Sequence, residues 1–392
     1  MRNYLKLAFC VTLTLCAEAF AQTVSTPIDE HNPAVTSHPP VAYVYVSSTV
    51  PGGNVNEIRA FAAAPNGKLT TVPGSPFQEN AISMAVNGKY LFAVDGYGAD
   101  IDAYRIESDG ALRYAATTDT AQSNDCNVLG PLFLDHTGKS LYDMEFNGSG
   151  CDNNTYVTFS VDKSNGGLKD PGNSSGNAWL YLPASFIGDN VYAYSANCIE
   201  DSYWGIYGFK RSADGLLTEI NINAAPPTPP EGYFYCPSLA AADPTDHVAI
   251  SMQPVNQEDF SPDRLPQLAT YTADAEGNLT TTSTRSNMPK TSVVSVTDLK
   301  MSPSGKLLAV GGTEGLEIFH FNGSKPITSY TGILKKDEIN QFFWDNHNHL
   351  YAISWSADKL YVFTVTPTSY SEAPGSPYAI SQPQNVIVQP EP

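Results

Sequence analysis

The sequence predicts an all-β chain that folds as a seven-bladed β-propeller of four-stranded antiparallel blades, with its ring closed by a C-terminal strand that completes blade 1. Three observations predict this fold. A polar turn followed by an apolar run recurs six times, an apolar–aromatic pair recurs seven times, and one apolar strand is left over at the C-terminal end. Repeats spaced by about 50 residues are typical of propeller blades. Helix signals are nearly absent, and 29 glycines and 29 prolines suit a chain rich in turns.

The first repeat marks the turn between the first two strands of a blade. Residues 302–312, SPSGKLLAVGG, show it most clearly, because a polar turn containing Gly305 precedes an unbroken apolar run. Such turn residues tolerate the positive φ of a tight hairpin, and the apolar run suits a strand buried on both faces. The six copies lie at residues 87–93, 137–142, 188–193, 245–249, 304–309 and 348–352.

The second repeat marks the third strand of each blade. The apolar–aromatic pairs are Ile58/Phe61, Ile101/Tyr104, Tyr156/Phe159, Ile206/Phe209, Leu268/Tyr271, Ile318/Phe321 and Leu360/Phe363. In five units a turn containing glycine and leucine follows the pair, which predicts a second hairpin and hence a meander of about four strands. The glycines of these turns are Gly67, Gly110, Gly166, Gly215 and Gly277.

The two ends of the propeller predict how the ring closes. The first unit begins at residues 42–46 and has strands for only three positions, because the Pro-rich stretch before it suits no strand. The last unit is complete by about Tyr378, yet the apolar residues 385–388 follow it. We expect this C-terminal strand to be the inner strand of blade 1, which would leave no open sheet edge. A frayed tail is the alternative.

The N-terminal residues are typical of a secretory signal peptide. A basic start, an uncharged segment over residues 7–16 and the small-residue site Ala19–Ala21 predict a signal peptide at residues 1–21. Its apolar core is too short to span a bilayer. The Pro-, Ser- and Thr-rich composition of residues 22–40 predicts a disordered lead-in. We expect residues 41–392 to form a single propeller domain. We therefore expect a protein exported to the periplasm or the extracellular medium, with no membrane span.

Four cysteines remain after signal cleavage: Cys126, Cys151, Cys198 and Cys236. An even number in an exported chain favours disulfides, with three possible pairings. The loops between strands 2 and 3 and those entering each blade share one face of a propeller, which we call the upper face. Placement in these loops favours Cys126–Cys151 and Cys198–Cys236. Free thiols or a soft metal site are the alternatives, but no C-x-x-C pair supports zinc, and we expect no metal and no cofactor.

Charge excludes two classes of partner. The formal net charge of −19 argues against nucleic acid and against anionic membranes. A charge of this sign also favours solubility outside the cell. The remaining partner classes are a small molecule, a glycan or a protein, and we expect the chain itself to be a monomer.

Several short sequences carry a resemblance to a known family: NGKL at 66–69, PGSPF at 73–77 with its echo PGSPY at 374–378, and SPSGK at 302–306. Over most of residues 41–390 the units resemble the seven-bladed lactonase-type propellers, which include 6-phosphogluconolactonase-like and muconate-cycloisomerase-like proteins. The Gly-His to Trp-Asp pattern of WD40 repeats is missing, since the single Trp344-Asp345 falls at the end of an inner strand.

The resemblance implies a lactone hydrolase, but its catalytic motif is incomplete here. Enzymes of this family carry a Pro-His-Pro-His-type segment before one inner strand, followed by an Asp-x-Gly-x-Asp turn. Residues 94–101, which contain Asp95 and Asp100, match this turn best. The preceding residues 78–83 contain no histidine, so the family's catalytic histidine has no counterpart in this chain. Elsewhere His347-x-His349 has the spacing of half a metal site, but no partner for it is visible, and a position at a turn is the alternative. His136 and His247 lie at turns on the opposite face.

The upper-face loops supply the candidate ligand-binding residues, because these loops converge on the central channel of a propeller. Carboxylates beside aromatic rings suit a carbohydrate, a cationic ligand or Ca²⁺, although no D-x-D-x-D-G loop is present. The alternative is that the acids cover a secreted surface and the aromatics pack beneath loops. The candidates are Asp95, Tyr97, Asp100, Asp152, Glu200, Asp201, Tyr203, Trp204, Phe234 and Tyr235, with Arg264 in the insertion of blade 5.

Three hypotheses for function follow. The first is a non-enzymatic exported propeller that binds a glycan, a small molecule or a protein on its upper face. The second is a lactonase-like hydrolase with an altered site, in which Asp95 or Asp100 acts as general base and Arg264 lies near the developing oxyanion. The third is a structural ring within a larger surface assembly.

Overall fold

The computed structural model describes residues 39–50, 52–53, 55–96, 100–119, 131–144, 156–173, 183–199 and 203–390. The predicted signal peptide, nearly all of the lead-in, and the pair Cys126–Cys151 lie outside these residues. The described residues form strands and turns without a helix, and so none of them makes a helix with the length and apolar character of a membrane span.

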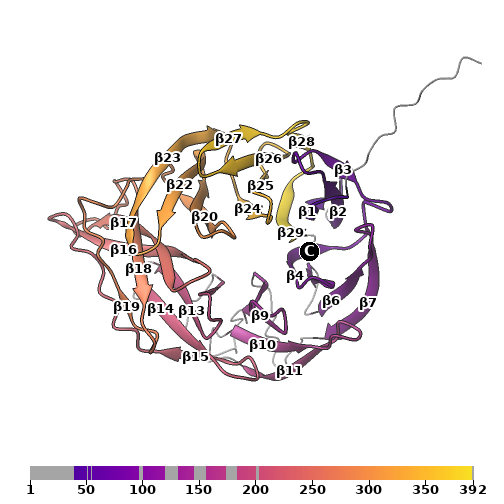
Figure 1. The fold of residues 1–392 in the computed structure, drawn as a ribbon, viewed down its shortest axis with the longest axis horizontal. Coiled ribbons are helices and arrows are strands. Elements are labelled where there is room, and N and C mark those ends of the chain that lie inside the picture. Colours follow the sequence, from indigo (N-terminus) through magenta and orange to yellow (C-terminus); the bar gives the residue numbers. More distant parts are fainter. Residues whose placement is uncertain are drawn as a thin grey trace, which may run out of the picture. The chain divides into compact units, whose positions relative to one another are not determined.

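Seven antiparallel sheets follow one another around a ring, as the sequence predicts (Figure 1). Blade 2 comprises β4 (Ala81–Val86), β5 (Tyr90–Asp95), β6 (Asp100–Ile106) and β7 (Leu112–Asp119). Blade 3 comprises β8 (Phe133–Leu134), β9 (Ser140–Met144), β10 (Tyr156–Val161) and β11 (Leu168–Asn173). Blade 4 comprises β12 (Ser185–Phe186), β13 (Tyr192–Ile199), β14 (Tyr203–Arg211) and β15 (Leu217–Ile220).

The last three blades repeat this order from the inner to the outer strand. Blade 5 comprises β16 (Tyr233–Ala242), β17 (His247–Asn256), β18 (Gln267–Ala273) and β19 (Leu279–Thr280). Blade 6 comprises β20 (Val296–Met301), β21 (Leu307–Gly312), β22 (Gly315–Asn322) and β23 (Lys325–Lys335). Blade 7 comprises β24 (Gln341–Trp344), β25 (His349–Ser354), β26 (Lys359–Thr366) and β27 (Ser369–Glu372), and the short β28 (Tyr378–Ala379) also pairs with β26.

Blade 1 joins the two ends of the propeller. It comprises β1 (Ala42–Thr49), β2 (Asn56–Ala63), β3 (Leu69–Thr71) and, as its inner strand, β29 (Pro383–Pro390). Strand β29 lies antiparallel to β1, with Val388 opposite Val44 and Val386 opposite Val46. The predicted closure is confirmed, and the frayed-tail alternative is wrong. It also explains why seven blades show only six copies of the first turn: in blade 1 the chain ends replace that turn.

The apolar runs after these turns form the second strand of each blade and supply the core. Every residue of β21 and of β25 is buried, because each of these strands lies between two others of its sheet and between two neighbouring blades. The paired aromatic residues of the second repeat lie in the third strands, such as Phe209 in β14 and Phe363 in β26.

A recurring contact joins successive blades. The hydroxyl of Tyr45 in blade 1 donates to the carbonyl oxygen of Gly110 in the β6–β7 turn of blade 2, at 2.9 Å. The same bond links Tyr142 to Gly215 at 2.7 Å and Tyr194 to Gly277 at 2.9 Å. These turn glycines have positive φ, and a Cβ at Gly110 would lie only 2.3 Å from the ring of Tyr43. Glycine is therefore required there both by backbone conformation and by the close approach of the neighbouring blade.

Candidate functional site

A cavity of about 570 Å³ lies along the central channel, against the inner strands β12, β16, β20 and β24 of blades 4 to 7. A volume of this size suits a small-molecule ligand. The wall combines apolar strand residues with a few polar groups, of which His136, Asp243, Asp298, Lys300 and Gln341 matter most for its chemistry. The cavity therefore offers a concave site with fixed hydrogen-bonding groups.

An ion pair on β20 dominates the electrostatics of this wall. Lys300 Nζ lies 2.7 Å from Asp298 Oδ1 and 2.9 Å from Asp298 Oδ2, so both carboxylate oxygens contact the ammonium group. The backbone N–H of Leu299 donates to Oδ1, and that of Phe342 on β24 donates to Oδ2, each at 2.9 Å. The Asp298 carboxylate therefore accepts hydrogen bonds from three donors. The residue is only 8 % exposed. This arrangement fixes the position of both charges and joins blade 6 to blade 7.

The strand period explains why these two side chains meet. Asp298 and Lys300 are two residues apart in a β-strand, so they project from the same face. The charge on Lys300 also lies 5.7 Å from the centre of the Phe342 ring. On the adjacent strand, the side-chain carbonyl of Gln341 accepts a 2.7 Å bond from the backbone N–H of Val386 in β29. The amide side of Gln341 therefore remains to donate to a ligand.

The second carboxylate of the wall is also engaged. Asp243 accepts bonds from the hydroxyl and the backbone N–H of Thr245, and from the backbone N–H of His247. Its Oδ2 lies 3.0 Å from His247 Nδ1. These bonds close the turn between β16 and β17, so the carboxylate serves the turn rather than a reaction.

His136 is the one histidine among the residues that line the cavity. It lies in the turn between β8 and β9, with its ring 6.0 Å from that of Phe186. Burial lowers its pKa below the ordinary value, while the neighbouring carboxylate of Asp135 opposes the shift. Burial therefore favours the neutral form of the imidazole, which can accept a proton. The sequence analysis assigned this histidine only to a turn on the opposite face and missed its place at the cavity.

His347 and His349, the pair with the spacing of half a metal site, instead form hydrogen bonds to Asp345 within their own turn. The imidazole of His349 is buried, and its Nδ1 lies 2.7 Å from Asp345 Oδ2. Asp345 also accepts bonds from the backbone N–H groups of His347 and His349. Within the residues that the structure describes, no three His, Cys, Asp or Glu side chains are grouped to hold a metal ion.

On blade 2 the structure brings together several carboxylates. Asp95 ends β5 and Asp100 begins β6, where it pairs with Asp119 of β7. Burial, reinforced by the charges of Asp119, Asp102 and Asp95, raises the pKa of Asp100. Burial likewise raises the pKa of Glu79, which accepts a hydrogen bond from Tyr104. None of these acids lines the channel cavity.

The aromatic candidates of blade 5 lie at the start of β16, not in the loop before it. Tyr235 is 2 % exposed, and its hydroxyl donates to Gln267 Oε1 at 2.6 Å. The ring of Phe234 lies 6.1 Å from that of Phe260 in the β17–β18 connection. Arg264, in the same connection, has its guanidinium carbon 3.8 Å from the centre of the Tyr233 ring. Arg264 thus belongs to blade 5, whereas Asp95 and Asp100 belong to blade 2.

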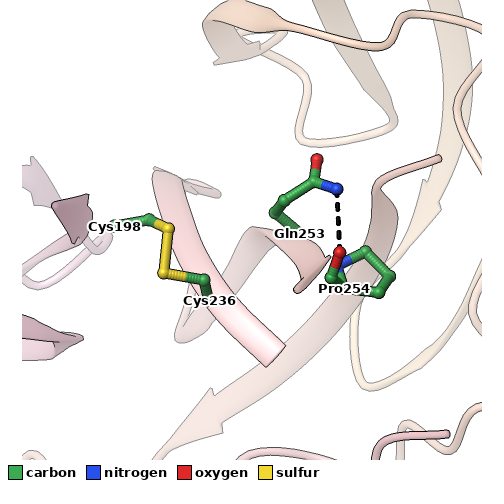
Figure 2. The surroundings of a disulfide bond; sticks show 4 residues. All are labelled: Cys198, Cys236, Gln253 and Pro254. Atoms are coloured by element: carbon green, nitrogen blue, oxygen red, sulfur yellow. Dashed lines mark hydrogen bonds between the residues drawn. A yellow bond between two sulfur atoms is a disulfide. The ribbon is translucent and has the colours of Figure 1, made fainter. Parts of the chain in front are cut away.

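The disulfide Cys198–Cys236 joins blades 4 and 5, with the two Cα atoms 5.2 Å apart (Figure 2). This pairing was the one expected. Both cysteines, however, lie within strands and not in loops, because β13 continues to pair with β14 at Cys198 and β16 pairs with β17 at Cys236. Beside the bridge, Gln253 lies opposite Cys236 in the register of the sheet.

Tyr97, Asp152, Glu200 and Asp201 lie outside the described residues, as do Cys126 and Cys151. The backbones of Tyr203 and Trp204 begin β14, opposite Ile199 and Cys198. The channel residues Asp298, Lys300 and Gln341 were missed by the sequence analysis. The signal that could have found them is the alternating pair of opposite charges in VTDLKM, in a strand expected to be the inner one of its blade.

No protein-family model matches the chain, and no curated protein does. Solved structures do match it. A periplasmic gluconolactonase of Pseudomonas aeruginosa superimposes with a TM-score of 0.61 at 14% identity, covering 88% of this chain and 98% of that protein. A 6-phosphogluconolactonase candidate of Bacteroides fragilis gives a TM-score of 0.59 at 15% identity, covering 91% of this chain and 99% of that protein.

The chain has the fold of the lactonase-type seven-bladed propellers. The resemblance in the turn sequences is therefore confirmed at the level of the fold. At 14% and 15% identity the similarity reaches no further than the fold, and the activity must be argued from the residues of this chain.

Proposed function

We propose that this protein is an exported binding propeller that holds a small hydroxylated molecule in its central channel without transforming it. The observation that carries this proposal is that both carboxylates lining the cavity of about 570 Å³ already accept hydrogen bonds from the protein. Asp243 closes a turn and Asp298 is held by three donors. Both carboxylates are engaged in hydrogen bonds within the protein, while the amide of Gln341 and the ammonium of Lys300 supply fixed donors for hydroxyl groups.

Export is supported by the chemistry of the cysteines and by the N-terminal sequence. The disulfide Cys198–Cys236 needs an oxidising compartment to persist. Residues 1–21 have the composition of a signal peptide. We propose a periplasmic or extracellular location, and a monomer that uses the upper face and the channel.

Isothermal titration of the mature protein, residues 22–392, against a panel of sugars, aldonates and aldonolactones tests this proposal. We expect one ligand class to bind with 1:1 stoichiometry. The variants Lys300→Met and Gln341→Leu each remove a donor of the wall and should weaken binding by roughly 10-fold. Asp109→Asn, on an exposed turn of blade 2, is a control that should bind like the parent. Equal affinity in all variants would place the ligand elsewhere.

A second candidate function, a lactonase-like hydrolase, is favoured by two observations. The neutral imidazole of His136 lines the cavity and could act as general base on a water molecule. The raised pKa of Asp100 provides the other candidate base, on blade 2. Base-promoted hydrolysis adds hydroxide to the lactone carbonyl, breaks the ring C–O bond and releases a hydroxy acid.

Acid release from aldonolactones and acyl lactones decides between binding and hydrolysis. Turnover that is lost in His136→Gln would place the chemistry in the channel. Turnover that is lost only in an Asp95→Asn, Asp100→Asn double variant would place it on blade 2. Turnover of either kind overturns the proposal of binding without chemistry. If no turnover above the buffer rate is measured, the hydrolase hypothesis is wrong.

A further inference from the structure

Two arginines on blade 5 differ from all the other described arginines. Arg59, Arg105, Arg113 and Arg211 each contact an Asp or Glu side chain at 3.8 Å or less. In the part of the chain that the structure describes, Arg264 and Arg285 contact none. The chain carries 40 acidic against 21 basic residues, so carboxylates are plentiful. Two exposed guanidinium groups without one therefore call for an explanation.

The fold brings both arginines to the neighbourhood of Gln267. Arg264 lies in the β17–β18 connection, three residues before Gln267, the first residue of β18. After β19 the chain runs back along β18 until Lys290 forms a bridge with Gln267. On this path the backbone carbonyl of Arg285 accepts a bond from Gln267 Nε2 at 3.2 Å. Both connections belong to the upper face, so both arginines border Gln267.

Two glutamine side chains, the partly buried Gln253 and the buried Gln267, hold the backbone near these arginines. Gln253 Nε2 donates to the carbonyl oxygen of Arg264 at 2.7 Å, and Gln253 lies opposite Cys236 of the disulfide (Figure 2). Tyr235 donates to Gln267, which in turn holds the carbonyl of Arg285. The disulfide, Gln253 and Gln267 thus fix both arginine backbones on a rigid part of the blade.

Electrostatics agrees with this placement. Burial raises the pKa of Tyr235, and the charges of Arg285 and Arg264 both oppose the increase. The charges of both guanidinium groups thus oppose the effect of burial on the Tyr235 hydroxyl. The guanidinium of Arg264 rests on the face of Tyr233 at 3.8 Å, and such stacking leaves its N–H edges free to bind a carboxylate in a fork.

An exposed aromatic ring completes the surface. Phe260 is 62% exposed and has a φ of 57°, a backbone conformation that is rare for a bulky residue. Residues held in such conformations with their side chains in solvent are found most often at binding sites. In the same connection as Arg264, an exposed ring of this kind can pack against the apolar C–H face of a sugar ring.

We propose that Arg264 and Arg285, with the exposed ring of Phe260, form a site for an acidic saccharide, in which the guanidinium groups bind the carboxylate of a sugar acid. A single negative charge suits the site better than a doubly charged phosphate. The acidic residues Glu258, Asp259 and Asp263 lie in the same connection and offset part of the arginine charge.

This site is separate from the channel cavity, since none of its residues lines that cavity. The proposal goes beyond channel binding and does not depend on it. The variant Lys300→Met, which alters the channel, should leave oligogalacturonate binding unchanged. A negative result for the arginine site is therefore distinguishable from a negative result for the channel site.

The test measures affinity of the mature protein for oligogalacturonate, galacturonate and gluconate, with neutral maltohexaose as the comparison ligand. We expect the acidic ligands to bind and maltohexaose not to bind. An Arg264→Gln, Arg285→Gln double variant should lose at least about 10-fold in affinity, because each arginine makes charge-assisted bonds. Arg113→Gln, an exposed arginine of blade 2, is the matched control and should bind like the parent.

Three further comparisons identify the ligand source and its chemistry. Binding of oligogalacturonate but not of the two monomers would indicate a polymer, and equal binding of the monomers would indicate free sugar acids. Phe260→Ala should weaken the oligosaccharide several-fold, and added salt should weaken every acidic ligand. Tighter binding of polyglutamate or inorganic phosphate, equal binding of maltohexaose, or an unchanged affinity in the double variant would each overturn the proposal. Thermal melting of each variant shows whether it is folded.

Discussion

Deleting residues 381–392 removes β29, the strand that pairs with β1 and closes the ring. Three apolar side chains lose their burial: Val386, Ile387 and Val388, which are 0%, 2% and 1% exposed. At roughly 1.5–3 kcal/mol for each side chain, the loss is about 5–9 kcal/mol before any backbone hydrogen bond is counted. The total stability of a domain is about 5–15 kcal/mol. We therefore expect the truncated protein to lack a cooperative unfolding transition or to melt far below the parent.

Circular dichroism during thermal and urea unfolding of the 22–380 and 22–392 proteins measures this effect. Truncation after Pro390 is the control and should melt like the parent. Ile387→Ala is a milder change that should cost about 2–5 kcal/mol, while Gln384→Ala, at an exposed position of the same strand, should cost little. If the 22–380 protein melts within about 2 °C of the parent, the reasoning about closure is refuted.

Three other predictions concern stability. Tyr194→Phe leaves a glycine carbonyl of the next blade without its donor and should cost about 1–3 kcal/mol in urea unfolding, whereas Tyr114→Phe, at an exposed position, should cost less. Reduction of Cys198–Cys236 frees a loop with a sequence separation of 38 and should lower the melting temperature, with a loss of about 4 kcal/mol by loop entropy; an unchanged temperature in dithiothreitol would contradict this. Glu79 has a raised pKa in the folded protein, so its contribution is favourable at acid pH and is lost as pH rises; Glu79→Gln should melt above the parent at pH 7, with the difference shrinking toward pH 4.

The fold could be predicted from the sequence because its signals are local. Each turn such as SPSGK and each aromatic of a third strand reports on one hairpin, and hairpins in series make a blade. The closing strand could be predicted for a different reason. Residues 385–388 form an apolar strand that their own unit does not need, and the first unit lacks one strand. The extra strand can therefore be assigned to the first unit.

The binding surfaces could not be predicted in the same way, because they arise between segments that are far apart in the chain. Asp298 belongs to β20, but one of its donors is the backbone of Phe342 in the next blade. Arg285 reaches Gln267 only because the chain turns back along β18 after β19. His136 was assigned to a turn, and the turn is there, but the position of a turn does not reveal what the imidazole faces. Periodicity indicates which strand a residue occupies and carries no information on the neighbouring blade.

The pairing of β29 with β1 also determines when the propeller ring can close. Strand β1 is among the first segments of the propeller to be synthesised, and its partner is the last. Until translation is nearly finished, the first blade has an exposed edge that any free strand could occupy. Contacts between residues so distant in the chain form slowly. Closure of the ring therefore requires that β1 capture β29, and a protease that removes β29 before this event would leave an open ring.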